Sequence, residues 1–168
     1  MNDEKRALIE QNRKRQSLKA MSYNRYLLVR YVTALFFFTN IYWFIAMIMS
    51  ESSLYFVPLI LIIVIIMSIA EQVKMYSTPT NRPIYTTFCF FTLFLTNVIF
   101  MILTGFSDTF TKLYPFLVEG TRSERMIFII LIIGLLLSGF VLYRLYEIKN
   151  MKDKQMKRIK QYEKLINS

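Results

Sequence analysis

Four long apolar segments without a charged residue alternate with polar links along this chain. They run over residues 31–50, 52–70, 83–107 and 126–143. A helix needs about 20 apolar residues to cross the hydrocarbon core of a membrane, because each residue advances it by about 1.5 Å. Unpaired backbone amides are excluded from lipid, and the alternating polarity of a membrane barrel is missing. The pattern therefore predicts four transmembrane helices, over about 28–50, 53–71, 83–106 and 126–146.

The links between the apolar segments constrain how these helices are arranged. Residues 50–53 leave room only for a tight turn, so the first two helices are expected to be antiparallel neighbours. We expect an all-α polytopic membrane protein with an antiparallel bundle of four helices. Its predicted parts are a basic segment over 1–30, a transmembrane domain over 31–143, and a basic helix over 144–168 that continues the last span, because no Gly or Pro interrupts it.

Lysine and arginine are distributed unevenly over the polar segments. Residues 1–30 and 144–168 hold eight each, 71–82 holds two, and 108–125 holds three. Four spans place both chain ends and the middle link on one side, which then carries 18 of the 21 basic residues. Cytoplasmic loops carry such an excess. We therefore expect a protein of the cell membrane with both termini in the cytoplasm.

The first and third spans share a polar pattern, as do the second and fourth. Offsets of 57 and 70 residues superpose Thr39 and Asn40 on Thr96 and Asn97, and Ser68 on Ser138. Two tandem helical hairpins related by an axis along the membrane normal would produce this pattern. A chance match between apolar segments is the other interpretation.

The link between the third and fourth spans contains apolar residues at helical spacing. Phe110, Leu113, Tyr114 and Leu117 follow i, i+3, i+4, i+7 positions. A short segment lying in the membrane interface, a cap over the bundle, and a loop with its apolar residues tucked against the spans all fit this spacing.

Polar and small side chains inside the spans are the candidate functional residues. Asn40 and Asn97 lie near the middle of their spans, with Thr39 and Thr96 beside them. Amides in hydrocarbon need partners, so these residues are expected either to hydrogen-bond across helices or to line a path for a substrate or ion. Gly134 and Ser138 are four residues apart, a spacing that lets helices approach closely. Their partner would be another span or another subunit.

The basic tail combines a loose apolar stripe with a predicted ion pair. The stripe contains Ile148, Ile159, Tyr162 and Ile166. Asp153 and Lys157 are spaced for an i, i+4 pair. A solvated collar that sets orientation, attachment to anionic lipid head groups and docking of a cytoplasmic partner are all compatible with the tail. The candidate contact residues are Lys152, Lys157, Arg158 and Lys160. We expect no nucleic-acid binding, since topology explains these charges.

The four uncharged segments contain no Asp, Glu, Lys, Arg or His for chemistry at membrane depth. The chain contains no histidine and one cysteine, Cys89. We therefore predict no catalytic residue, metal site or cofactor, and no enzymatic activity. The leading interpretation is a non-enzymatic membrane protein that contacts another membrane protein, as an accessory or assembly subunit or as an immunity-type protein. The alternative is a small oligomeric transporter or channel with a polar Asn/Thr lining. A third interpretation is an enzyme that acts on lipid at the inner surface through Glu71, Lys74 or Arg82.

Overall fold

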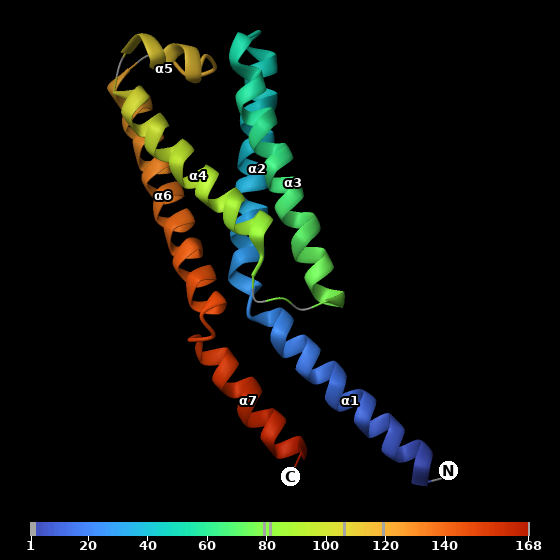
Figure 1. The fold of residues 1–168 in the computed structure, drawn as a ribbon. Coiled ribbons are helices and arrows are strands. Elements are labelled where there is room, and N and C mark those ends of the chain that lie inside the picture. The colour runs from blue at the N-terminus through green and yellow to red at the C-terminus, as the bar shows by residue number, and fades with distance from the viewer. Residues whose placement is uncertain (1–2, 79, 81, 106, 119, 168) are drawn as a thin grey trace.

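The protein is helical, and no strand occurs among the residues that the computed structural model describes, 3–78, 80, 82–105, 107–118 and 120–167 (Figure 1). A single 3-10 turn, η1, covers Ser53–Tyr55 and precedes α3. The α-helices are α1 Asp3–Asn24, α2 Leu27–Met49, α3 Phe56–Ser77, α4 Ile84–Thr104, α5 Ser107–Leu113, α6 Thr121–Lys149 and α7 Lys154–Asn167.

Four helices, α2, α3, α4 and α6, are long and apolar enough to cross a membrane. This confirms the prediction of an all-helical chain with four candidate spans. Only 22–28% of each span's apolar window is buried inside the protein, so most of the apolar surface faces outward, as it does in contact with lipid. The helices α3 and α6 extend past the predicted limits, to Ser77 and back to Thr121.

The four long helices form two pairs that diverge (Figure 1). Helix α2 packs along α3, and α4 packs along α6, while α3 and α4 join the two pairs. The pairs lie close together toward the end of the molecule that carries both chain termini. They separate toward the opposite end, where α5 lies across the tips of α4 and α6. We call these the terminal end and the α5 end.

Two apolar cores hold the helices. The core nearer the terminal end contains the fully buried side chains of Val29, Ile65, Phe90 and Val141. The core at the α5 end forms where Phe110, Leu113 and Tyr114 pack against α4 and α6. The apolar residues of the link after α4 therefore cap the ends of these helices, which was one of its three predicted arrangements.

The prediction that the tail continues the last span as one helix is wrong, because the helix is interrupted between Lys149 and Lys154. Met151 adopts a left-handed backbone with φ of 54°. Asp153 directly precedes α7 and caps it, because its Oδ2 accepts a hydrogen bond from the backbone N–H of Met156 at 3.1 Å. Lys157 is not its ionic partner, because the carboxylate is occupied by Arg25.

The Arg25–Asp153 pair joins the α1–α2 junction to the α6–α7 junction, and we call it the latch. Arg25 donates from Nη2 to Oδ1 at 2.7 Å and from Nε to Oδ2 at 3.0 Å. The two side chains are only 4% and 0% exposed. Burial of the ions is unfavourable, and the bidentate geometry offsets this cost. The latch therefore fixes where α1 and α7 leave the four long helices.

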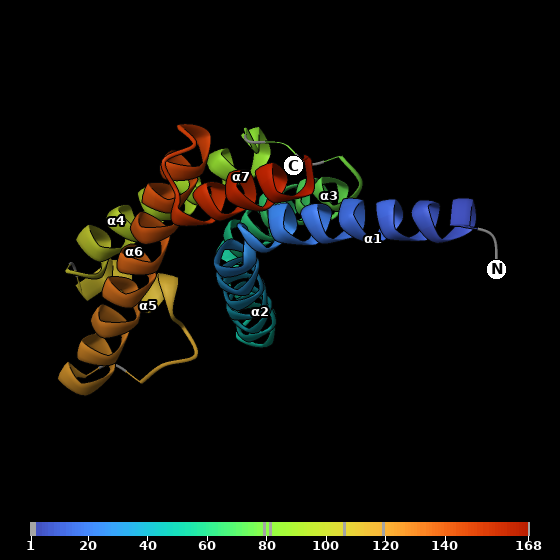
Figure 2. The ribbon, with the colours of Figure 1, turned by 90° about the horizontal axis from the view of Figure 1, so that it is seen from below.

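Helices α1 and α7 pack against each other and project together from the terminal end (Figure 2). Ile148 and Ile159 of the predicted apolar stripe are buried. The side chains of Tyr162 and Ile166 lie outside the described residues. The stripe thus contributes to packing at its described positions.

Candidate functional site

A cavity of about 670 Å³ lies where the two helix pairs diverge, between α2 on one side and α4 and α6 on the other. Tyr42, Ile130 and Ile133 line it and are 73%, 51% and 50% exposed. The cavity is therefore open to the surroundings of the helices, and we call it the lateral groove. Most of its wall is apolar, as expected of a surface that meets lipid or an apolar helix.

The two asparagines predicted as candidates both line the lateral groove. The Nδ2 group of Asn40 donates to the carbonyl oxygen of Phe36 at 2.8 Å, and that of Asn97 donates to the carbonyl oxygen of Leu93 at 2.8 Å. Within the described residues these are bonds inside one helix, so the predicted hydrogen bonds across helices are not formed. Each carboxamide keeps an N–H and an acceptor oxygen for further bonding.

Thr39 and Thr96 line the same groove and also bond back to their own helices. Their hydroxyls donate to the carbonyl oxygens of Leu35 and Thr92, each at 2.8 Å. This is the usual arrangement of threonine inside a helix. The structure thus brings the four polar candidates from two helices to one cavity, and the hydroxyl oxygens of the threonines are acceptors there.

The small residues of α6 face α4 of the same chain. A Cβ atom added at Gly134 would lie 2.8 Å from Oδ1 of Asn97, and one at Gly139 would lie 3.5 Å from the ring of Phe94. The hydroxyl of Ser138 donates to the carbonyl oxygen of Gly134 at 2.8 Å. The predicted close packing therefore occurs between two spans, and the glycine at 134 makes room for an asparagine of the groove.

Aromatic side chains close the groove toward the α5 end. Trp43 lies with its ring centroid 5.3 Å from that of Phe100 and 6.1 Å from that of Tyr114. Its Nε1–H donates to the carbonyl oxygen of Leu113 at 3.3 Å. Burial raises the pKa of Tyr114 to about 12, with a hydrogen bond to Thr104 acting weakly in the other direction. The phenol is therefore neutral, and the aromatic closure carries no charge at physiological pH.

The groove offers its occupant apolar contacts and uncharged polar groups. Its described lining contains no charged side chain and no nucleophile paired with a base. It offers apolar contact along its length and amide and hydroxyl groups near the middle. Such a surface matches the shape and polarity of an apolar, elongated molecule that carries a polar group at one level.

Two polar clusters near the terminal end were not predicted from the sequence. Buried Gln72 donates from Nε2 to Oγ1 of Thr33 at 2.9 Å and to Oγ of Ser68 at 3.0 Å. Glu71 accepts hydrogen bonds from the backbone of Tyr85 and Thr86 at the start of α4. The only available signal was that Glu71 and Gln72 directly follow an uncharged span; nothing in the sequence identified their partners.

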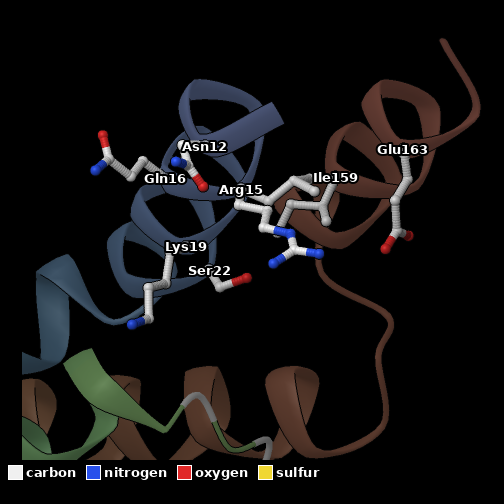
Figure 3. Close-up of a pocket in the computed structure, with 8 residues that line it drawn as sticks. Asn12, Arg15, Gln16, Lys19, Ser22, Ile159 and Glu163 are labelled. Atoms are coloured by element: carbon white, nitrogen blue, oxygen red, sulfur yellow. The ribbon is translucent and has the colours of Figure 1, made fainter. Parts of the chain in front are cut away.

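The four basic candidates of the tail are exposed, and none of them lines the lateral groove. They are Lys152, Lys157, Arg158 and Lys160. A separate cavity of about 530 Å³ between α1 and α7 is lined by Arg15, Lys19 and Ile159 (Figure 3). Arg15 extends from α1 toward α7 there. Ile159 is the one candidate residue of the tail among the described residues that line this open cleft, so the cleft adds no support to partner docking on the tail.

The lateral groove is thus the concave surface that best combines the predicted residues with a shape able to hold a ligand. Comparison of the chain with protein-family models, with curated proteins and with solved structures gives no match.

Proposed function

We propose that this protein is a non-enzymatic subunit of the cell membrane that binds a transmembrane helix of another membrane protein in the lateral groove. It would act as an accessory or assembly subunit, or as an immunity-type protein. One observation carries the proposal: a cavity open to the side of the helices holds Asn40 and Asn97, each with unused hydrogen-bonding groups.

The length of the groove supports a helix that packs against its open side. Among the lining residues of α2, Leu35, Thr39, Tyr42 and Ala46 form one helical stripe, which extends for about 16 Å at 1.5 Å per residue. This apolar trough runs along the direction of the spans and carries polar groups near its middle. A partner helix with one polar side chain at that level would gain roughly 0.6 to 2 kcal/mol from each hydrogen bond.

The orientation of the protein is part of the proposal. Both termini lie at one end of the molecule (Figure 1), and the segments at that end carry most of the lysines and arginines. The excess of basic residues supports a cytoplasmic location of α1 and α7. The α5 end would then face the outside, with α2–α3 and α4–α6 as two tandem hairpins of the same topology.

Site-specific photo-crosslinking in intact membranes tests the proposal. A benzophenone amino acid replaces Tyr42, which lines the groove, or Ile63, which is 52% exposed on α3 and lies outside it. We expect the Tyr42 probe to form a discrete adduct that mass spectrometry maps to a transmembrane peptide of another protein. The combined changes Asn40→Leu and Asn97→Leu should remove this adduct. An adduct formed equally from position 63, or none from position 42, contradicts the proposal.

The second candidate function is a small oligomeric transporter or channel. The observation that favours it is that Asn40, Asn97, Thr39 and Thr96 meet in one cavity. Its test is solute or ion flux in liposomes containing the purified protein. A flux that disappears with Asn40→Leu and Asn97→Leu would favour transport over helix binding, and an absence of flux would exclude it.

A further inference from the structure

Another cavity, of about 610 Å³, lies at the terminal end where α3 is followed by α4, and we call it the α3–α4 cavity. Two basic side chains, Lys74 and Arg82, line it together with Tyr85. Deeper along α3 the wall is formed by Met67 and Ala70. The cavity is separate from the lateral groove, since these residues do not line the groove.

The charge of this cavity is positive. Lys74 and Arg82 are exposed, and neither forms an ion pair among the described residues. The carboxylate of Glu71 is engaged by α4, because Oε2 accepts from the backbone N–H and the hydroxyl of Thr86, both at 2.7 Å. The positive end of the α4 dipole further offsets its charge. Two cations are therefore available to an anion in the cavity.

The polarity of the cavity changes along one stripe of α3. Positions 67, 70 and 74 follow helical spacing on one face. Ala70 and Met67 lie about 6 and 10 Å closer to the middle of the helix than Lys74, at about 1.5 Å per residue. Both are exposed. A molecule that follows this stripe meets cations first and an apolar surface next, which is the order of groups in a phospholipid.

We propose that this cavity binds the phosphate group of an anionic phospholipid, with an acyl chain lying along Met67 and Ala70. Lys74 and Arg82 contact the phosphate oxygens, and Tyr85 lies at the level of the head group, where tyrosine is favoured. A free phosphate would use the same two cations but not the apolar stripe. The proposal depends on the membrane location of the chain and is independent of helix binding in the lateral groove.

The test uses the purified full-length protein in a neutral detergent, with phosphatidylglycerol, phosphatidylcholine or inorganic phosphate added. Thermal stability and native mass spectrometry report binding. We expect phosphatidylglycerol to raise Tm and to remain bound, with little effect of phosphatidylcholine or phosphate. The change Lys74→Gln with Arg82→Gln should weaken binding about 25-fold, which corresponds to about 1 kcal/mol for each basic residue near the membrane surface.

A matched control removes the same charge elsewhere. Lys157→Gln with Arg158→Gln on α7 should leave phosphatidylglycerol binding within about twofold of the unsubstituted protein. Equal losses in the two double variants would overturn the proposal in favour of diffuse attraction to the basic surface. Protection by phosphate as strong as that by phosphatidylglycerol would also overturn it, in favour of a free-ion site.

A variant that keeps both charges guards against a folding defect in the double variant. Ala70→Phe fills the apolar part of the cavity at an exposed position. It should weaken phosphatidylglycerol binding several-fold while Tm without lipid stays unchanged. Unaltered lipid binding in this variant would contradict the acyl-chain placement and the lipid as ligand.

Discussion

The α2–α3 and α4–α6 pairs carry matching polar patterns but are held together by different contacts. Between α2 and α3, the side chain of Gln72 bridges to Thr33 at 2.9 Å. Between α4 and α6, Gly134 lets the backbone approach Asn97, whereas Val64 occupies the matching position of α3. Similar sequence patterns thus support helix pairing by a side-chain hydrogen bond in one case and by close backbone approach in the other.

The arginines that precede α2 and α4 also differ in their burial and in their contacts. Arg25 and Arg82 occupy matching positions, each fifteen residues before a groove asparagine. Arg25 is buried in the latch with Asp153, whereas Arg82 is exposed in the α3–α4 cavity. A matching position therefore does not determine a role; the role follows from which distant residue the fold brings near.

The largest expected effect comes from the latch. Arg25→Ala leaves the carboxylate of Asp153 buried without its ionic partner, and such losses cost about 3–5 kcal/mol. The matched change Arg82→Ala should alter stability by less than about 0.5 kcal/mol, because it removes an exposed charge. Unfolding in detergent, followed by circular dichroism, measures both. Similar stability of the two variants would contradict the difference drawn between these arginines.

Acid should cause part of the loss of stability that is expected from Arg25→Ala, because protonation of Asp153 removes its ion pair with Arg25. Burial alone raises the pKa of Asp153, but the hydrogen bonds and charge of Arg25, with the N–H of Met156, outweigh it and lower the pKa below 3.8. The stabilisation is therefore complete above about pH 4 and is lost as the pH falls through the lowered pKa. Thermal unfolding between pH 7 and pH 2.5 should show a loss below pH 4 that Arg25→Ala reduces. An equal loss in both proteins would assign it to other carboxyl groups.

Substitution of the glycines of α6 sharpens the comparison between the pairs. In Gly134→Ala, the new Cβ would lie 2.8 Å from Oδ1 of Asn97, so the carboxamide must move. Overpacking of this kind costs about 1–3 kcal/mol. Gly139→Ala is the matched control, since its Cβ meets Phe94 at an ordinary 3.5 Å. Gly134→Ala should be the less stable variant, and adding Asn97→Ala should restore stability. No recovery in that double variant would show that Asn97 is not the obstacle.

The smallest expected effect concerns Gln72. A double-mutant cycle with Gln72→Leu and Thr33→Val isolates their hydrogen bond, which should contribute about 0.6 to 1.7 kcal/mol. The coupling energy is read from unfolding in detergent. Asn40→Leu serves as the comparison, because its described hydrogen bond stays within α2, and it should show no coupling to Gln72→Leu. A coupling near zero for Gln72 and Thr33 would remove the distinction between the two pairs.

The sequence was sufficient for the features that depend on local pattern. Uncharged length predicted the four long helices, and helical spacing at Phe110, Leu113 and Tyr114 indicated the apolar face that caps α4 and α6. The sequence was insufficient to predict features that depend on contacts between residues far apart in the chain. The helix is interrupted at Met151, where no Gly or Pro predicts an interruption. The interruption lies next to the contact between Arg25 and Asp153, which are 128 positions apart in the sequence. The hydrogen bonds of Asn40 and Asn97 to their own helices likewise depend on side-chain rotamers, which the spacing of residues does not determine.

The lateral groove could be anticipated only in part. The matching positions of Asn40 and Asn97 suggested a shared polar level. Their meeting in one open cavity depends on the divergence of the two helix pairs (Figure 1), which no residue pattern encodes directly. The aromatic closure by Trp43 and Tyr114 depends in addition on the docking of α5.

We expect the lateral groove to open into the hydrocarbon of a membrane, and the fluorescence of Trp43 tests this directly. Trp43 lines the groove and is the chain's single tryptophan, so fluorescence quenching in liposomes needs no substitution. Lipids brominated along their acyl chains should quench its emission strongly, whereas iodide in the water should have little effect. Strong quenching by iodide together with none by brominated lipid would contradict the account, because the groove would then open to water.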